Sequence, residues 1–246
     1  MAYYFDSDAS LFPFVLFSGT HLITLLVLGL ITFLFFRTLP RMKGTKLESV
    51  IRFGLIGIIL LSEISWHLWN VRNGQWTLQY SLPLQLCSIT LLLSAVLLFT
   101  RSIRLFPFVY FCGLAGALQA LLTPVLEFSY PHFRFFQFFI AHGAILWVIL
   151  YMIRVEGFRV QLRSIFPVLL QLNGLALLAG VVNVMTGGNY MFISGKPDYP
   201  SLLDWLGPWP WYLVSLQVVA VGMFVLLWLP FARRGEGVDI GWDQGE

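Results

Sequence analysis

The sequence predicts an all-α, polytopic membrane protein folded as a seven-transmembrane-helix bundle. Its residues are 58% hydrophobic and only 11% charged, whereas about a quarter of the residues in a soluble domain are charged. The apolar residues form runs long enough to cross a hydrocarbon core of about 30 Å, which takes about 20 helical residues. Because backbone polar groups in lipid must be satisfied within their own segment, each run is expected to be a helix.

The expected spans form a single transmembrane domain over residues 1–246. The first apolar run follows Asp6 and Asp8 and lacks a basic n-region, so we expect it to be a retained span and not a signal peptide. In chain order, the spans are predicted at residues 11–36, 49–71, 78–100, 105–126, 133–153, 165–185 and 209–231.

Basic residues predict the orientation of the bundle. Twelve of the fifteen lysines and arginines fall on one side of the predicted membrane, in the first, third and fifth connections and in the C-terminal tail. The side rich in lysine and arginine is normally cytoplasmic. We therefore expect the N-terminus outside and the C-terminus in the cytoplasm of a multi-pass cell-membrane protein, with a bacterial plasma membrane as the expected location. The residues counted on the rich side are Arg37, Arg41, Lys43, Lys46, Arg52, Arg101, Arg104, Arg154, Arg159, Arg163, Arg233 and Arg234.

Charge and cysteine usage exclude two classes of protein. The net charge of +3 lies in short connections and not on a basic face, and no aromatic RNA-binding motif is present, so nucleic acid is not an expected partner. Cys87 and Cys112 both lie inside apolar runs, unlike the cysteines of a small secreted disulfide scaffold. We expect both to be thiols.

The outer connection at residues 186–208 is the longest. Its Gly187, Gly188 and Pro197 exclude one continuous helix. A short interfacial turn is expected from Ser201 to Leu206, followed by aromatic residues at headgroup level. This segment is either a simple aromatic belt or a lid over the outer mouth of the bundle. The aromatic residues are Trp205, Trp209, Trp211 and Tyr212.

Polar side chains within the spans are the main candidates for function. An ionisable group at mid-membrane costs roughly 2.5–3.5 kcal/mol on insertion scales and usually faces the bundle interior. Counted at about 1.5 Å per residue, four of them lie roughly 12–15 Å below the outer surface, each on a different helix. We therefore predict a polar site in the outer half of the bilayer. The four are His21, Glu63, Cys87 and His142.

The spacing of polar residues predicts which helix faces line this site. In the second span, Glu63 and His67 are one turn apart, so Glu63 is expected to be either neutral or paired with His67. Gly113 and Gly116 permit close helix approach in the fourth span. These faces either line a pocket or only join helices by hydrogen bonds. The other members are Trp66 and Asn70 in the second span, Gln79, Pro83, Thr90 and Ser94 with Cys87 in the third, and Cys112, Gln119 and Thr123 in the fourth.

Four sequence motifs resemble a known family. They are LPLQLCS at 82–88, FFIAHG at 138–143, GNYMF at 188–192 and SLLDWLGPWPWY at 201–212. Together they resemble the bacterial YwaF-type integral membrane family, over about residues 67–231. That family is distantly similar to the eukaryotic transmembrane protein 164 group, whose members are lipid acyltransferases that use a cysteine. This chain has Gln85 two residues before the cysteine, where the bacterial family often has histidine.

The resemblance implies acyl transfer or acyl-ester hydrolysis with membrane lipids as substrate and no cofactor. By resemblance, Cys87 is the nucleophile that forms an S-acyl intermediate, and His142 is its base. Glu63 and His67 would orient the base or bind the polar headgroup. The remaining supporting candidates, several of them able to polarise the substrate carbonyl, are His21, Gln85, Gln119, Asn183, Asn189 and Tyr190.

Two other functions stay open. An intramembrane metal-dependent hydrolase would take its ligands from the imidazole and carboxylate groups at similar depth, although no tight metal-binding motif is present and no bound metal is expected. A small-molecule transporter or ligand-binding seven-span protein also fits a polar outer cavity. Against transport, the sequence has no internal repeat of the kind found in secondary carriers. The candidate metal ligands are His21, Glu63, His67 and His142.

Overall fold

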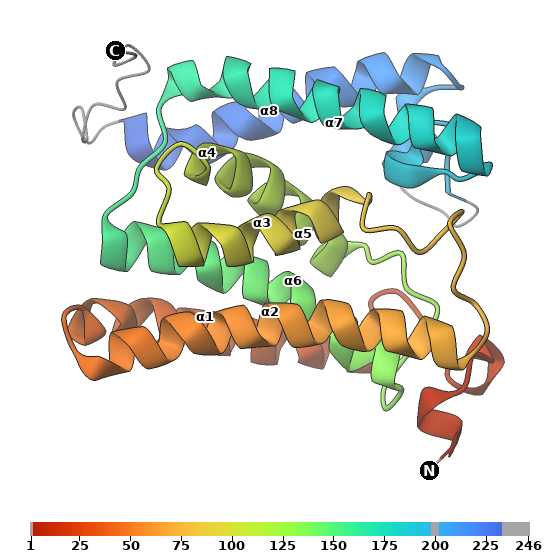
Figure 1. Cartoon of the computed structure of the whole chain (residues 1–246), viewed down its shortest axis with the longest axis horizontal. Coiled ribbons are helices and arrows are strands. Elements are labelled where there is room, and N and C mark those ends of the chain that lie inside the picture. The colour runs from red at the N-terminus through yellow and green to blue at the C-terminus, as the bar shows by residue number, and fades with distance from the viewer. Residues whose placement is uncertain (1, 198–201, 233–246) are drawn as a thin grey trace.

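Helices stack in three layers in the computed structural model, which describes residues 2–197 and 202–232 (Figure 1). The lower layer holds α1 (Gly19–Met42) and α2 (Lys46–Arg72). The middle layer holds α3 (Leu86–Thr100), the rod formed by α4 (Phe106–Phe108), η3 (Val109–Gly113) and α5 (Leu114–Leu122), and α6 (Phe133–Tyr151). The upper layer holds α7 (Ile165–Thr186) and α8 (Trp211–Ala232). The prediction of an all-α fold is confirmed for these residues, which form no β-strand.

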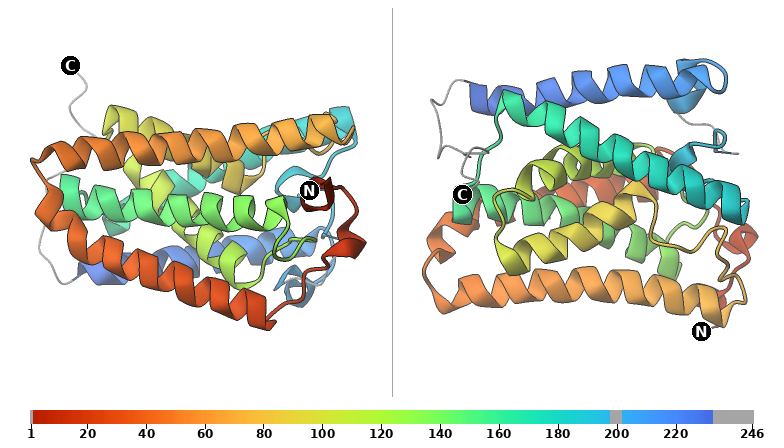
Figure 2. Two further views of the ribbon diagram at one scale, coloured as in Figure 1. Left: turned by 90° about the horizontal axis from the view of Figure 1, so that it is seen from below. Right: turned by 45° about the horizontal axis from the view of Figure 1, so that its top comes forward.

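The long helices run alongside one another, and helix α6 occupies the middle of the bundle (Figure 2). It packs against α1, α2, α3 and α5. Two-thirds of its apolar stretch is buried, compared with 11% for α1 and for α8. Side chains on α6 are therefore held in place by packing against four neighbouring helices.

Two predicted helix starts are wrong. Helix α1 begins at Gly19, after the N-cap Ser18, and not at residue 11. Residues before it form the short turns η1 (Ala2–Phe5) and η2 (Ala9–Leu11), and Phe14 N–H donates to Glu127 O at 2.8 Å. Helix α3 begins at Leu86 and not at residue 78, because Pro83 lacks an N–H and disfavours helical geometry at the preceding residue.

The other predicted spans agree with the helices within a few residues. Two middle-layer helices contain π-helical turns that hydropathy does not reveal. One is η3, between α4 and α5, and the other is η4 (Met152–Glu156), which continues α6. Cys112 is buried in η3, and both cysteines are free thiols as expected. A further 3-10 turn, η5 (Leu162–Ser164), leads into α7.

Four helices of the described chain are long and apolar enough to cross a membrane by length and composition. They span Gly19–Met42, Phe133–Glu156, Leu162–Thr186 and Trp211–Ala232. Shorter apolar helices are Leu86–Thr100 and Phe106–Leu122. These helices make the chain a membrane protein.

An ion-pair cluster joins three helices at the end of the bundle that carries most of the basic residues. Arg101 contacts Glu48 Oε1 through Nη2 at 3.2 Å and Glu156 Oε1 through Nε at 3.0 Å. Tyr151 O–H donates to the same Glu48 oxygen at 3.3 Å. Arg101 ends α3 in the left-handed conformation with φ of 52°. The cluster ties the start of α2 to the ends of α3 and α6.

Candidate functional site

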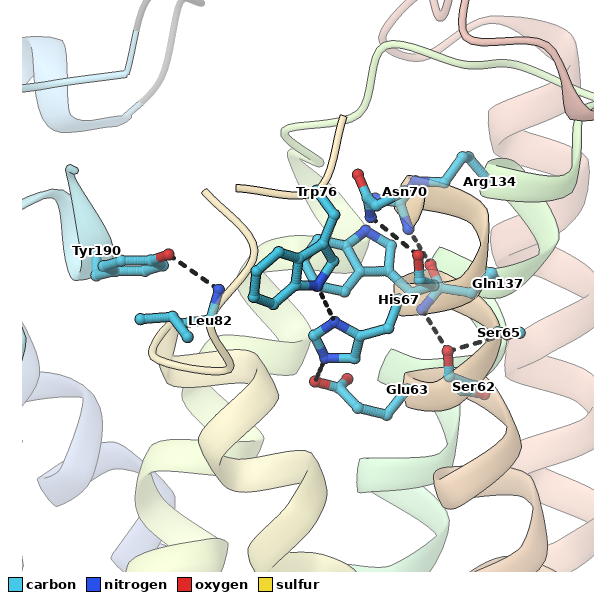
Figure 3. A network of polar contacts seen from close by, with 11 residues as sticks. Ser62, Glu63, Ser65, His67, Asn70, Trp76, Leu82, Arg134, Gln137 and Tyr190 are labelled. Atoms are coloured by element: carbon cyan, nitrogen blue, oxygen red, sulfur yellow. Dashed lines mark hydrogen bonds and ion pairs between the residues drawn. The ribbon is translucent and has the colours of Figure 1, made fainter. Parts of the chain in front are cut away.

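Glu63, His67 and Trp76 form a polar chain at the C-terminal end of α2, which the sequence predicts to be its outer end (Figure 3). The indole N–H of Trp76 donates to His67 Nδ1 at 3.1 Å. His67 Nε2 lies 3.5 Å from Glu63 Oε1. Since Nδ1 accepts a hydrogen bond, the neutral imidazole carries its proton on Nε2, facing the carboxylate. The pairing of Glu63 with His67 that the helical spacing left open is therefore present.

Glu63 is 7% exposed, and its Oε1 has no hydrogen-bond partner beyond this electrostatic contact within the described chain. The His67 side chain is 29% exposed. A buried carboxylate is costly unless it is paired. His67 is thus the electrostatic partner nearest to Glu63 Oε1, and it turns its second ring nitrogen toward the loop at residues 73–85.

Arg134 and Gln137 connect α6 to this part of α2. Arg134 donates a hydrogen bond to Gln137 Oε1, and Gln137 Nε2 donates to Ser62 O at 3.2 Å. The guanidinium also lies over the rings of Trp66 and Trp69, at 5.7 and 5.6 Å from their centroids. Cation–π contacts of this kind hold the arginine against α2.

His142 lies on α6 two turns beyond Arg134 and is 7% exposed. Its Nδ1 bonds to the carbonyl oxygen of Phe138 at 2.8 Å. This bond assigns the ring proton to Nδ1 and leaves Nε2 as a hydrogen-bond acceptor. A buried imidazole oriented in this way is able to take a proton at Nε2.

Cys87 lies in the first turn of α3 and is half-buried. A Cβ added at Gly116 on α5 would lie 3.8 Å from its sulfur. One turn deeper, a Cβ added at Gly113 would lie 3.7 Å from Thr90 Cβ and 3.0 Å from Ile145 Cγ2. These two glycines let α3, α5 and α6 pack closely, as the sequence predicted.

The register of these contacts relates Cys87 to His142. Thr90 on α3 and Ile145 on α6 both lie next to Gly113. Moving three residues along each helix toward the predicted outer side leads from Thr90 to Cys87, from Gly113 to Gly116 and from Ile145 to His142. Helices α3 and α6 are in direct contact. The thiol and the imidazole therefore belong to neighbouring helices and to the same level of the bundle.

Tyr190 joins the outer loop that follows α7 to the loop before α3. Its hydroxyl donates to Leu78 O at 2.8 Å. It also accepts from Leu82 N–H at 2.9 Å, the bond drawn in Figure 3. Asn183 brackets the tyrosine backbone, donating to Tyr190 O at 3.1 Å and accepting from Tyr190 N–H at 2.7 Å. Gln85 Oε1 accepts from Met191 N–H at 3.0 Å. Three of the predicted supporting residues thus hold one outer loop on another.

Asn189 and the aromatic residues near α8 complete this loop structure. Asn189 Oδ1 accepts from Ser194 N–H at 3.0 Å, and Trp209 N–H donates to Ile193 O at 3.1 Å. Tyr212 is fully buried and donates to Phe192 O, so its side chain packs against the loop after α7, and its place at headgroup level stays a prediction. The exposed tryptophans Trp205, Trp209 and Trp211 fit the predicted aromatic belt. Ser201, Arg233 and Arg234 lie outside the described residues.

His21 and Gln119 lie apart from the polar chain of Glu63. His21 is fully buried, its Nδ1 accepts from Phe17 N–H at 3.1 Å, and its Nε2 bonds to Leu121 O at 2.9 Å. Nε2 joins the start of α1 to the end of α5, and Nδ1 bonds to the backbone just before α1. Gln119 donates to the Thr123 hydroxyl in that same end of α5. These contacts give both residues a structural role.

His132 is a polar centre that sequence reasoning missed. It is fully buried and caps α6, accepting from Arg134 N–H through Nδ1 at 3.1 Å. Its Nε2 bonds to Asp6 O at 2.9 Å, and its ring stacks on Phe128 with centroids 4.1 Å apart. Burial lowers the pKa of His132 below its usual value. Its position just before an apolar run is that of an N-cap, but histidine is not one of the residues that normally signal a cap, so the sequence carries little indication of this role.

The histidines and acidic residues do not form a metal site in the part of the chain that the structure describes. No group of three His, Cys, Asp or Glu side chains lies close enough there to hold a metal ion. His21 in particular uses both ring nitrogens elsewhere. The proposed ligand set of an intramembrane metal hydrolase is not assembled by these residues.

Comparison of the sequence with known proteins finds a match to one family model. Neither curated proteins nor solved structures gave a match. The model of the TMEM164 family matches residues 16–228. That range includes α1 to α7, the outer loops, most of α8, and both Cys87 and His142. The chain therefore belongs to the TMEM164 family.

Proposed function

We propose that the protein is a membrane-embedded lipid acyltransferase or acyl-ester hydrolase that works through a thioester on Cys87, with His142 as its base. The observation that carries the proposal is the common level of Cys87, Gly116 and His142 on three helices packed around Gly113. Nucleophilic cysteine catalysis requires a thiol with a base nearby. Family membership supports a role in the membrane.

The proposal includes seven membrane crossings with the N-terminus outside. Seven helical rods follow one another along the described chain when α4, η3 and α5 are taken as one. Helix α2, with 27 residues, has the length of a span. The two shorter middle-layer helices are Leu86–Thr100 and Phe106–Leu122, and both are apolar. The excess of basic residues at the end that holds the α1–α2 turn supports a cytoplasmic side there.

The first half of the reaction would acylate the cysteine. His142 Nε2 takes the thiol proton as sulfur attacks the ester carbonyl of a lipid. The S–C bond forms, the ester C–O bond breaks, and the imidazolium returns the proton to the departing alcohol oxygen. The proton that Nδ1 shares with Phe138 O keeps Nε2 in the required acceptor state.

The second half would release the acyl group. An alcohol or water gives its proton to His142 Nε2 while its oxygen attacks the thioester carbon. The C–S bond breaks, and the sulfur recovers the proton, so the enzyme returns to its starting state. An alcohol gives a new ester, and water gives a free fatty acid.

Lipid conversion by the full chain in phospholipid vesicles tests this function. Cys87→Ala should reduce conversion to background, and His142→Gln should lower it by about 10²–10⁴-fold, the usual contribution of a positioned base. Cys112→Ala is the matched control, because Cys112 is also a free thiol but is buried in η3. Wild-type conversion by Cys87→Ala would overturn the proposal.

A further inference from the structure

The polar chain Trp76–His67–Glu63 has features of a binding site in addition to those of a structural contact. The Glu63 carboxyl group lies behind the imidazole, with Oε1 3.5 Å from Nε2. A carboxylate in that position fixes the tautomer and strengthens the other ring nitrogen as an acceptor. That nitrogen, Nδ1, faces an indole N–H from a loop and not a group in the helical core.

The indole of Trp76 is a replaceable donor. Trp76 is 39% exposed, and His67 keeps 29% of its side-chain surface accessible. The same loop is fastened elsewhere, by Tyr190 to Leu78 and Leu82. A shift of the Trp76 side chain would therefore uncover Nδ1 of His67 without releasing the loop.

The position of His67 relates it to the thiol. Figure 3 shows Glu63 and His67 projecting from α2 toward the loop that leads into α3, and α2 and α3 are in contact. Cys87 lies in the first turn of α3, directly after that loop. A lipid that reaches Cys87 from the outer side would pass its polar part near His67.

The charges around the chain favour a neutral ligand over a cation. Arg134 is close enough to Glu63 to interact with it electrostatically. Its guanidinium also covers the rings of Trp66 and Trp69, the aromatic faces that an ammonium headgroup would use. What remains is an accepting nitrogen, which suits a hydroxyl group.

We infer that His67 Nδ1, oriented by Glu63, binds the free hydroxyl of a lysolipid-type acyl acceptor, which takes the place of the Trp76 indole N–H. The inference rests on the proposed function in identifying this ligand as the acceptor. His67 is then a positioning residue that binds the hydroxyl before reaction, and Trp76 is a competing internal donor. The O–H turns from His67 Nδ1 to His142 Nε2 when its oxygen attacks the thioester, so the single hydroxyl proton passes to His142 alone.

Binding to a chain that cannot react provides the test. Full-length Cys87→Ala protein in detergent is titrated with a 1-acyl lysophospholipid and with its 2-deoxy analogue, which differs only in the hydroxyl. One hydrogen bond contributes about 0.5–1.5 kcal/mol, so the hydroxyl should tighten binding about 2- to 12-fold. In Cys87→Ala/His67→Phe the two lipids should bind equally.

Two further variants separate a binding role from a structural one. His67→Asn keeps an acceptor oxygen near the position of Nδ1 and should restore part of the hydroxyl preference. Trp76→Phe removes the competing donor and should tighten binding of the hydroxyl lipid by a few-fold. Trp209→Phe is the matched control, because it removes an indole bond of similar length to Ile193 O in the other outer loop.

Several outcomes would overturn the inference. These are an undiminished hydroxyl preference in the His67→Phe background, unchanged affinity in Trp76→Phe, or a His67-dependent preference for the headgroup amine instead of the hydroxyl. If His67→Phe fails to fold, the affinity of Trp76→Phe for the hydroxyl lipid decides whether the inference holds. Because Cys87 is absent throughout, failure of the thioester chemistry would overturn the proposed function and leave this binding result unaffected.

Discussion

The sulfur of Cys87 faces Gly116 on the neighbouring helix, where a Cβ added to the glycine would lie 3.8 Å from Sγ. That distance is ordinary van der Waals contact. The corresponding position one turn deeper is tighter, since a Cβ at Gly113 would lie 3.0 Å from Ile145 Cγ2. The two glycines therefore determine how closely α3, which carries Cys87, approaches α5 and α6. A larger side chain would fit at Gly116 but not at Gly113 without a shift of Ile145.

Alanine at these two positions should have opposite effects on stability. Gly116→Ala fits and gains helix propensity, so its thermal stability should be unchanged or raised by up to about 1 kcal/mol. Gly113→Ala must displace Ile145 and should destabilise the protein by about 1–3 kcal/mol. Thermal unfolding of the purified variants in one detergent compares them. Equal stabilities would contradict the close packing at Gly113.

Tyr190→Phe should loosen the outer loops while leaving the bundle folded. The variant removes the hydroxyl that bonds both Leu78 O and Leu82 N–H, and the loss of two such bonds costs about 1–3 kcal/mol locally. Limited proteolysis of the loop at residues 73–85 should become faster. Tyr80→Phe, at an exposed tyrosine of the same loop, is the control and should be cut at the wild-type rate.

Sequence reasoning found the helices better than their ends. Hydropathy located the apolar runs, but it extended the third span across the loop before Pro83 and the first span across Pro13. It also could not detect the π-helical turns, since their composition is that of an α-helix. These features depend on backbone hydrogen bonding, which an average over apolar residues does not measure.

The candidate site was predicted only in part, because spacing along a helix can be read from the sequence but the path of a loop cannot. The i, i+4 spacing predicted that Glu63 and His67 share a helix face, and the structure pairs them. Trp76 was not predicted as a partner, because its contact depends on the path of a loop. Tyr190 and Asn189 were candidates through resemblance, and their hydrogen bonds show that they hold the outer loop. Whether Cys87 and His142 react together stays a prediction.

Substitutions at Arg101 should separate ion pairing from backbone strain. Arg101→Ala loses both carboxylate partners and keeps a left-handed backbone with φ of 52° that costs a non-glycine residue about 1–2 kcal/mol. Arg101→Gly loses the same pairs but relieves that strain. We expect Arg101→Gly to unfold at a higher temperature than Arg101→Ala. The reverse order would contradict the strained conformation.

Acid should weaken the attachment of the N-terminal segment through His132. Burial lowers its folded-state pKa below the unfolded value of 6.5. The unfolded chain therefore binds the proton more readily, and stability that is complete above about pH 6.5 declines as the pH falls toward the folded-state pKa. His132→Asn keeps an N-cap acceptor without titrating. Its thermal stability should change less than that of the wild type between pH 7.5 and pH 5, and equal changes would exclude His132 as the cause.

The most direct test of the central claim is intact-protein mass spectrometry of the full chain after incubation with phospholipid vesicles. We predict a mass increase of one acyl chain on the wild-type protein and on Cys112→Ala, released by hydroxylamine as expected for a thioester, and absent from Cys87→Ser. Peptide mapping should locate the acyl group on Cys87. Continued lipid conversion with an unmodified Cys87 would contradict covalent catalysis by this residue.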